Sequence, residues 1–306
     1  MRLLKSHTAD LSHLPTEARN PATENLDSIS PLELAGTIHA ADCEALAAVE
    51  RVLPQIAEGI EAISSRLEAG GRLFYMGAGT SGRLGVLDAS ECPPTYNTPP
   101  ELVQGLIAGG DVALRRSVER AEDDEAQGRR DLEQHGFTAN DVLVGIAASG
   151  RTPYVLGGVR YARKLGAFAI GLSCVPDSEL ARAAEIAITP DTGPEAVTGS
   201  TRMKAGTATK LVLNLLSTGA MVRLGYVYGN LMVNVQPTNT KLRDRAARII
   251  ATITGLSYSE AARLLERAGS VKTAVVMQKL NLGRDEAEQR LLSARGRLRA
   301  ALEMRS

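Results

Sequence analysis

The sequence predicts an α/β protein: a doubly wound parallel five-stranded sheet, with N-terminal helices before it and a small C-terminal three-helix domain after it. Five short apolar runs alternate with helical segments, as in this class of fold. The runs are apolar at almost every position, which is typical of strands that helices cover on both faces. After about residue 240 no strand pattern remains, and capping signals indicate helices only.

The first forty residues predict an irregular arm followed by a first helix. Turn-forming residues are frequent before residue 30. Ser30-Pro31-Leu32-Glu33 then has the pattern of a helix start, with a capping serine, proline at the first position and glutamate at the third. A second helix, bent at Pro54, is predicted over residues 41–67 because its apolar residues follow helical spacing.

Residues 41–240 form the predicted sheet domain. Its strands are predicted at residues 72–76, 102–107, 142–147, 168–172 and 185–188. The helices between them are predicted at residues 111–134, 153–165 and 178–184, and a long helix follows at residues 201–223. Because helices separate most of the successive strands, the strands are expected to run parallel.

Residues 241–306 form the predicted helical C-terminal domain. Ser257-Tyr258-Ser259-Glu260 is a capping-box pattern before a helix that reaches residue 268. A second helix covers residues 270–280 and ends at Asn281-Leu282-Gly283. Asp285 caps a third helix, which extends to about residue 302.

Composition limits the classes of partner. The 306 residues hold 35 basic and 35 acidic side chains, so no net field attracts nucleic acid or an anionic membrane. Aromatic residues make up only 3% of the chain, which disfavours base-stacking surfaces. Cys43, Cys92 and Cys174 are far apart and form no C-x-x-C pair, as in proteins of a reducing compartment. We therefore expect a cytoplasmic protein without nucleic-acid or membrane partners.

A glycine-rich segment, Gly77-Ala78-Gly79-Thr80-Ser81-Gly82, directly follows the first predicted strand and is expected to be a loop. It matches the G-x-G-x-x-G fingerprint of dinucleotide sites, which also need an acidic residue at the end of the next strand. Glu101 has about the right spacing but precedes its strand, which disfavours NAD. No G-x-x-x-x-G-K-[ST] nucleotide loop is present.

A second such segment, Ala147-Ala148-Ser149-Gly150-Arg151-Thr152-Pro153, follows the third predicted strand and opens a helix. In a parallel sheet both segments emerge at the carboxyl ends of strands, where ligands bind. Backbone N–H groups at a helix start suit a phosphate dianion, and hydroxyl side chains add donors. Those hydroxyls belong to Thr80, Ser81, Ser149 and Thr152. The pair predicts that these loops hold a phosphorylated sugar; the alternative is two ordinary turn and cap sequences.

A third polar stretch covers residues 198–204, before the long helix, and includes Ser200, Arg202 and Lys204. Its hydroxyls and cations are candidate donors to a sugar. The alternative interpretation is a capping segment in which Arg202 and Lys204 are solvated.

These segments resemble the motifs of the N-acetylmuramic acid 6-phosphate etherase family. The quoted motifs are Gly77-Ala78-Gly79-Thr80-Ser81-Gly82-Arg83-Leu84-Gly85, Asp88-Ala89-Ser90-Glu91-Cys92-Pro93-Pro94-Thr95, Ala147-Ala148-Ser149-Gly150-Arg151-Thr152-Pro153-Tyr154 and Thr198-Gly199-Ser200-Thr201-Arg202-Met203-Lys204-Ala205-Gly206-Thr207. Thr16-Glu17-x-x-Asn20 near the start is also similar to the family's pattern. The resemblance covers nearly the whole chain, and the motifs are long and specific.

The resemblance implies a sugar isomerase (SIS) domain, a ubiquitin-associated-like (UBA-like) helical tail and a homodimer. It implies cleavage of the D-lactyl ether of N-acetylmuramic acid 6-phosphate to N-acetylglucosamine 6-phosphate and D-lactate, in cell-wall amino sugar recycling. An ether at C3 resists direct hydrolysis, whereas an open-chain aldehyde at C1 acidifies C2 and allows elimination followed by hydration. This route needs an acid and a base but no metal or cofactor, and we expect none.

The resemblance also implies two catalytic carboxylates, Glu91 and Glu122. The implied role of Glu91 is to protonate the departing lactate and then to activate water, whereas Glu122 handles the C2 proton. From the residues alone, Glu91 is interpreted as a solvated loop residue and Glu122 as part of a solvated acidic helix face. The residues predicted to bind the phosphosugar are Gly79, Thr80, Ser81, Ser149, Gly150, Arg151, Thr152, Ser200 and Lys204.

Two other functions remain open at this stage. A regulator with the same domain would bind a phosphosugar without converting it, and an aldose–ketose isomerase would interconvert sugar phosphates without releasing lactate. The presence of Glu91 and Glu122 within their motifs favours the lyase.

Overall fold

The computed structural model describes residues 15–118 and 120–304, and its sheet is a single five-stranded layer. The first fourteen residues of the predicted arm lie outside the described residues. All strands pair in parallel in the order β2-β1-β3-β4-β5, which confirms the predicted fold class. The strands are β1 (Leu73–Gly77), β2 (Val103–Ile107), β3 (Val142–Ile146), β4 (Phe168–Leu172) and β5 (Ile186–Ile188).

Alternate residues of each strand enter two separate hydrophobic cores. In β1, Leu73 and Tyr75 belong to the core on one face, whereas Phe74 and Met76 belong to the core on the other. All five residues of β1 are buried, because helices cover both faces of the sheet. This double burial explains why the strands are continuously apolar in the sequence.

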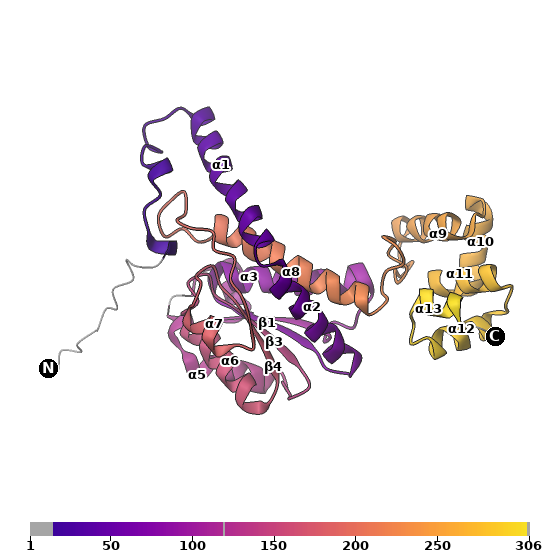
Figure 1. Cartoon of the computed structure of the whole chain (residues 1–306). Coiled ribbons are helices and arrows are strands. Elements are labelled where there is room, and N and C mark those ends of the chain that lie inside the picture. Colours follow the sequence, from indigo (N-terminus) through magenta and orange to yellow (C-terminus); the bar gives the residue numbers. More distant parts are fainter. Residues whose placement is uncertain (1–14, 119, 305–306) are drawn as a thin grey trace.

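Helices divide between the two faces of the sheet (Figure 1). The core that contains Leu73 also holds residues of α2 (Leu53–Glu68), α3 (Gly79–Tyr96) and α8 (Lys204–Arg223). The core that contains Phe74 holds residues of α5 (Glu125–Gln134), α6 (Pro153–Leu165) and α7 (Glu179–Ala183). The sheet is therefore doubly wound, as predicted.

The N-terminal region contains two 3₁₀ turns, η1 (Pro15–Glu17) and η2 (Pro21–Thr23), and the helix α1 (Pro31–Glu50). Ser30 and Glu33 form the predicted capping box. The predicted start of the second helix at residue 41 is wrong: α1 continues to Glu50, and α2 begins at Leu53, so that Pro54 occupies a first-turn position that needs no N–H donor. The N-terminal half of α1 projects away from the sheet (Figure 1).

Two segments differ from prediction in ways that matter for function. Residues 79–82 are not a loop but the first turn of α3, which extends to Tyr96 and carries Glu91 on a helix. The single helix predicted over residues 111–134 is also wrong. The chain there forms α4 (Val112–Arg115), η3 (Ala121–Asp123) and α5, because Arg120 adopts a left-handed conformation (φ 69°) and the Asp124 side chain starts a new helix.

The C-terminal region contains five helices among the described residues instead of the predicted three. They are α9 (Thr240–Thr254), α10 (Tyr258–Ala268), α11 (Val271–Leu280), α12 (Arg284–Ser293) and α13 (Leu298–Glu303). The predicted helix over residues 285–302 is interrupted, because Arg295 (φ 52°) and Gly296 (φ 71°) are both left-handed. The five helices share a core of their own. None of the described helices is long and apolar enough to cross a membrane.

Close helix packing gives a stability prediction. A Cβ on Gly128 in α5 would collide with the backbone oxygen of Tyr154 in α6, so Gly128→Ala should lower the free energy of unfolding by about 2 kcal/mol. Urea denaturation measures this change. Gly36→Ala, on an exposed turn of α1 with no atom within 4 Å of the new Cβ, is the control. It should leave stability unchanged or raise it by up to about 1 kcal/mol; equal losses in both variants would contradict the packing argument.

Candidate phosphosugar site at the carboxyl edge of the sheet

The two predicted phosphate segments are neighbours in space. β1 pairs with β3, and Gly77 lies opposite Ile146, so both strands end at the same level. β2 lies on one side of β1, and β3 lies on the other. The boundary between β1 and β3 is therefore the point where the strand order reverses. Ligands of doubly wound folds bind at such a point, outside the carboxyl ends of the strands.

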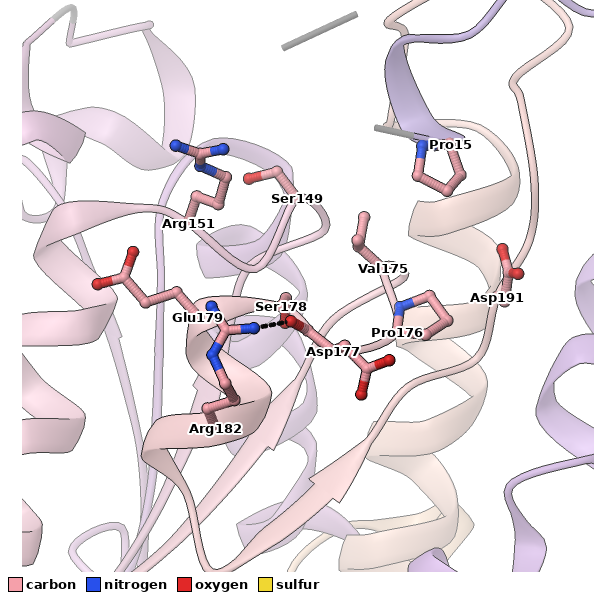
Figure 2. A pocket seen from close by; sticks show the side chains of 10 residues that line it. All are labelled: Pro15, Ser149, Arg151, Val175, Pro176, Asp177, Ser178, Glu179, Arg182 and Asp191. Carbon is pink, nitrogen blue, oxygen red and sulfur yellow. Dashed lines mark hydrogen bonds between the residues drawn. The ribbon is translucent and has the colours of Figure 1, made fainter. Parts of the chain in front are cut away.

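A cavity of about 520 Å³ opens at this edge (Figure 2). Of the predicted binding residues, Ser149 and Arg151 line it. The other lining residues are Pro15, Val175, Pro176, Asp177, Ser178, Glu179, Arg182 and Asp191. The cavity therefore combines the loop after β3 with the loop after β4 and the N-terminal arm.

Gly150 holds the β3 loop tightly against the β4 loop. Its φ of +66° favours glycine, and a Cβ there would collide with the side chain of Ser178. Cys174 N–H donates to Ala148 O at 2.9 Å, and Leu180 N–H donates to Gly150 O at 2.9 Å. These contacts fix the backbone on both sides of Ser149.

Helix N-termini supply the positive end of the site. α6 begins at Pro153, and the side chain of its N-cap residue, Thr152, makes no capping hydrogen bond. α3 begins at Gly79, and its N-cap residue, Ala78, has a side chain that cannot accept a capping hydrogen bond. Uncapped N–H groups and the helix dipole favour an anion at both places. Thr80 and Ser81, in the first turn of α3, are half-buried beside them.

The N-terminus of α8, in contrast, is occupied by the buried carboxylate of Glu195. Glu195 accepts from Lys204 N–H at 2.9 Å and from Ala205 N–H at 3.0 Å. Burial raises the pKa of Glu195, while these two backbone donors and the Lys204 ammonium oppose the rise. Lys204 is itself 0% exposed, and its Nζ contacts Glu44 of α1 at 2.6 Å. Lys204 thus lies beside the cavity without lining it.

The N-terminal arm packs against the segment that precedes α8. Asn20 Nδ2 donates to Pro194 O at 3.4 Å, and Thr23 Oγ1 donates to Ala196 O at 2.8 Å. This segment leads to half-buried Ser200, and a Cβ on Gly206 would lie 3.6 Å from the Thr80 methyl group. The third polar stretch is therefore close to the first turn of α3.

The two predicted catalytic glutamates lie in different places. Glu122 is exposed on η3, which packs against α6. Glu91 is exposed on α3, twelve residues beyond Gly79. At a rise of about 1.5 Å per residue, it lies about 18 Å along the helix from the first turn. Within one chain, Glu91 is thus far from the phosphate segments.

Sequence reasoning missed the β4 loop, residues 175–178, and the carboxylates Glu195 and Glu44. The rule that identified the loops after β1 and β3 also applies to the loop after β4, so this signal was present in the sequence. Glu195 and Glu44 carry no local motif, because their partners lie nine or more residues away.

Comparison with known proteins agrees with the fold. Residues 55–163 match the glucokinase regulatory protein N-terminal SIS domain, and residues 133–219 match the SIS domain. The phosphoheptose isomerase GmhA from Neisseria gonorrhoeae is similar to 62% of this chain over 97% of its own, with 18% identity and a TM-score of 0.48. The two family matches, over residues 55–163 and 133–219, show that the chain contains a SIS domain.

Full-length relatives define the family more narrowly. N-acetylmuramic acid 6-phosphate etherase from Serratia proteamaculans is 55% identical over 96% of this chain and 99% of its own. N-acetylmuramic acid 6-phosphate etherase 2 from Vibrio parahaemolyticus is 54% identical over 96% of this chain and 98% of its own. The chain belongs to the N-acetylmuramic acid 6-phosphate etherase family.

The β3 loop gives a prediction about ligand binding. In Gly150→Ala, the new Cβ must displace the Ser178 side chain, and the alanine backbone must keep a φ that is unfavourable for alanine. Binding of N-acetylglucosamine 6-phosphate should therefore weaken by about tenfold or more. Calorimetric titration measures this. Gly206→Ala, whose Cβ would make only ordinary contacts at 3.6 Å beside Thr80, is the control and should bind as the unchanged protein does. Normal binding by Gly150→Ala would show that the loop does not shape the site.

Proposed function

We propose that this protein cleaves the D-lactyl ether of N-acetylmuramic acid 6-phosphate, giving N-acetylglucosamine 6-phosphate and D-lactate in cell-wall amino sugar recycling. The observation that carries the proposal is 55% identity to an etherase over nearly the whole of both chains. The site described above supports it, because two uncapped helix starts and a cavity of about 520 Å³ meet at one edge of the sheet. The expected place of action is the cytoplasm, without nucleic-acid or membrane partners.

The 6-phosphate binds between the starts of α3 and α6. Backbone N–H groups of both first turns and the hydroxyls of Thr80, Ser81 and Ser149 donate to its oxygens. Thr152 adds a further hydroxyl, and Arg151 adds a charge-assisted donor from the cavity wall. Gly79 and Gly150 let the backbone approach, and Ser200 contacts the sugar from the segment before α8. Lys204 acts indirectly, by fixing that segment through Glu44.

The reaction proceeds by elimination and then hydration. Ring opening exposes the C1 aldehyde, which acidifies the proton on C2. Glu122 removes this proton, the C3–O bond breaks, and Glu91 protonates the departing lactate oxygen. Glu91 then takes a proton from water, which adds at C3, and a proton returns to C2. The sum is one ether and one water converted to one sugar phosphate and one lactate, without redox change.

Glu122 serves the site of its own chain. Its 3₁₀ turn packs against α6, whose first turn receives the phosphate. C2 is six bonds from phosphorus, a span of at most about 9 Å at about 1.5 Å per bond. The packing of η3 on α6 is the observation that supports assigning the C2 proton to Glu122.

Glu91 serves the site of a partner protomer. A substrate span of about 9 Å and a glutamate side chain of about 5 Å together reach about 14 Å, less than the 18 Å or so along α3. The Glu91 carboxylate therefore cannot reach a substrate whose phosphate lies at the start of the same helix. A homodimer removes this difficulty if α3 of one protomer faces the cavity of the other.

An exposed apolar face supports this dimer. Leu87 lies one turn before Glu91 on α3 and is 51% exposed, and Leu215 and Val222 on the neighbouring α8 are 39% and 46% exposed. Such a patch around a glutamate is typical of an interface. A second copy of the chain would bury the patch and take Glu91 out of bulk water.

The activity prediction is direct. The protein should release D-lactate from N-acetylmuramic acid 6-phosphate, and the sugar product formed in D₂O should carry deuterium at C2. Glu91→Gln and Glu122→Gln should each lower kcat by about 10²–10⁴-fold, because each removes one proton-transfer group. Glu101→Gln, an exposed glutamate on the turn before β2, is the control and should keep normal turnover. Absence of lactate, or an unlabelled product, would exclude this mechanism.

The shared site makes a second prediction. Glu91→Gln and Glu122→Gln chains, each inactive alone, should regain activity when unfolded together and refolded. A mixed dimer then has one site with both glutamates and one with neither, so random mixing should restore about one quarter of normal activity. If Glu91 works in its own chain, the mixture stays inactive, which would contradict the proposal.

A further inference from the structure

A second cavity lies at the opposite, amino edge of the sheet. Its volume is about 530 Å³, and it is bounded by the end of α2, the residue before β2, the chain after α8 and the helical C-terminal region. Leu67 and Glu68 precede β1, and Leu102 precedes β2, so this cavity is separated from the phosphosugar site by the length of the strands. Figure 1 shows the C-terminal helices on this side of the molecule.

Lys272 of α11 faces this cavity without an acidic partner. Its Nζ donates to Gly296 O at 2.7 Å and lies 5.6 Å from the centre of the Tyr226 ring. Within residues 15–118 and 120–304, no carboxylate lies within 4.0 Å of this ammonium group. Burial lowers the pKa of Lys272 to about 8. A half-buried ammonium group without a counter-ion is costly, which marks the position as one that an anion would stabilise.

Two arginines increase the positive charge of the same cavity. Arg295 and Arg297 both contact one oxygen of Glu68, at 3.2 and 2.9 Å. Three cations therefore face one carboxylate, which leaves an excess of two positive charges at neutral pH. Arginine guanidinium groups and a lysine ammonium group are the usual ligands of phosphate and carboxylate groups.

Apart from Asn234, the remaining side chains of the cavity wall are mainly apolar. Leu67, Leu102 and Leu224 line it together with the ring of Tyr226. A neighbouring cavity of about 340 Å³ shares Lys272 and Asn234 with the first, so the space exceeds that of an inorganic ion. Pockets for small organic ligands combine an apolar wall with a few polar groups in this way.

We propose that this cavity, between the SIS domain and the C-terminal helices, binds a small organic anion. The anionic group, a phosphate monoester or a carboxylate, pairs with Lys272 and Arg297, and the apolar part of the ligand packs on the leucines and Tyr226. The C-terminal helices supply the cations, and the sheet domain supplies the leucines and Tyr226. The bound molecule contacts both regions and therefore holds the C-terminal helices against the sheet domain. This site is separate from the phosphosugar site, and anion binding there does not require the activity proposed above.

Calorimetric titration of the full-length protein tests the proposal. The probes are inorganic phosphate, phenyl phosphate and benzoate at pH 7, where Lys272 is mostly protonated. Phosphate should bind at two places, of which Lys272→Met removes one and Arg151→Met the other. Phenyl phosphate should bind the Lys272 site about tenfold more tightly than phosphate, because its ring is buried on the apolar wall. Binding of benzoate at the Lys272 site would indicate that the site accepts a carboxylate. If benzoate does not bind while phenyl phosphate does, the site is specific for a phosphate monoester.

Lys279→Met, on an exposed position of the same helix, is the matched control and should bind as the unchanged protein does.

Thermal unfolding gives a second measurement. The folded-state pKa of Lys272 is below its unfolded value, so protonation at pH 7 costs stability, and Lys272→Met should melt higher in the absence of anions. Phosphate should then raise the melting temperature of the unchanged protein more than that of the variant. A Lys272→Met protein that binds every probe normally overturns the proposal, as does equal loss in Lys279→Met.

Discussion

The close approach of α3 to β1 is the constraint on which the arrangement of functional residues depends. A Cβ on Gly77 would lie 2.6 Å from Gly82 N, and a Cβ on Gly82 would lie 2.7 Å from Gly77 O. The first turn of α3 is therefore fixed at the carboxyl end of β1, and the helix must run back toward the amino edge of the sheet. Thr80 and Ser81 stay at one edge, while Glu91 is carried to the other. A single helix thus carries the proposed phosphate-binding hydroxyls at one edge of the sheet and the proposed catalytic carboxylate toward the other.

The capped start of α8 adds a second restriction. α8 begins near the carboxyl edge of the sheet, as α3 and α6 do, but the Glu195 carboxylate already occupies the N–H groups of Lys204 and Ala205. A dianion at that position would meet a buried carboxylate, which disfavours the start of α8 as a phosphate site and agrees with the proposed position between α3 and α6. The same carboxylate orders the segment before α8, on which the N-terminal arm packs. The polar motif at residues 198–204 therefore combines a structural role with its place beside the sugar.

The sequence predicted all five strands to within one residue at each end, because buried strands are largely apolar and glycines or prolines follow closely after them. Helix limits were less predictable. The break at Arg120 needs a left-handed residue that no local pattern requires, and Glu91 was expected in a loop because Pro93 and Pro94 are unusual inside a helix. The amphipathic pattern of α9 was present and was overlooked. The separation of Glu91 from the phosphate segments depends on helix direction, which a motif does not record.

The two edges of the sheet are physically connected through the end of α3. Asn234, which lines the cationic cavity, donates from Nδ2 to Tyr96 O at 2.6 Å. Tyr226, on the wall of the same cavity, packs edge-to-face on Tyr96 with ring centres 6.3 Å apart. Tyr96 is the last residue of α3, five residues after Glu91. An anion in this cavity would thus contact residues that hold the end of the catalytic helix. If Glu91 acts on the partner's substrate, as we propose, groups that do not touch that substrate must set the position of Glu91 within fractions of an ångström. The contacts of Asn234 and Tyr226 with Tyr96 are suited to that task, and with the proposed role of Glu91 they would link the cationic cavity to the reaction.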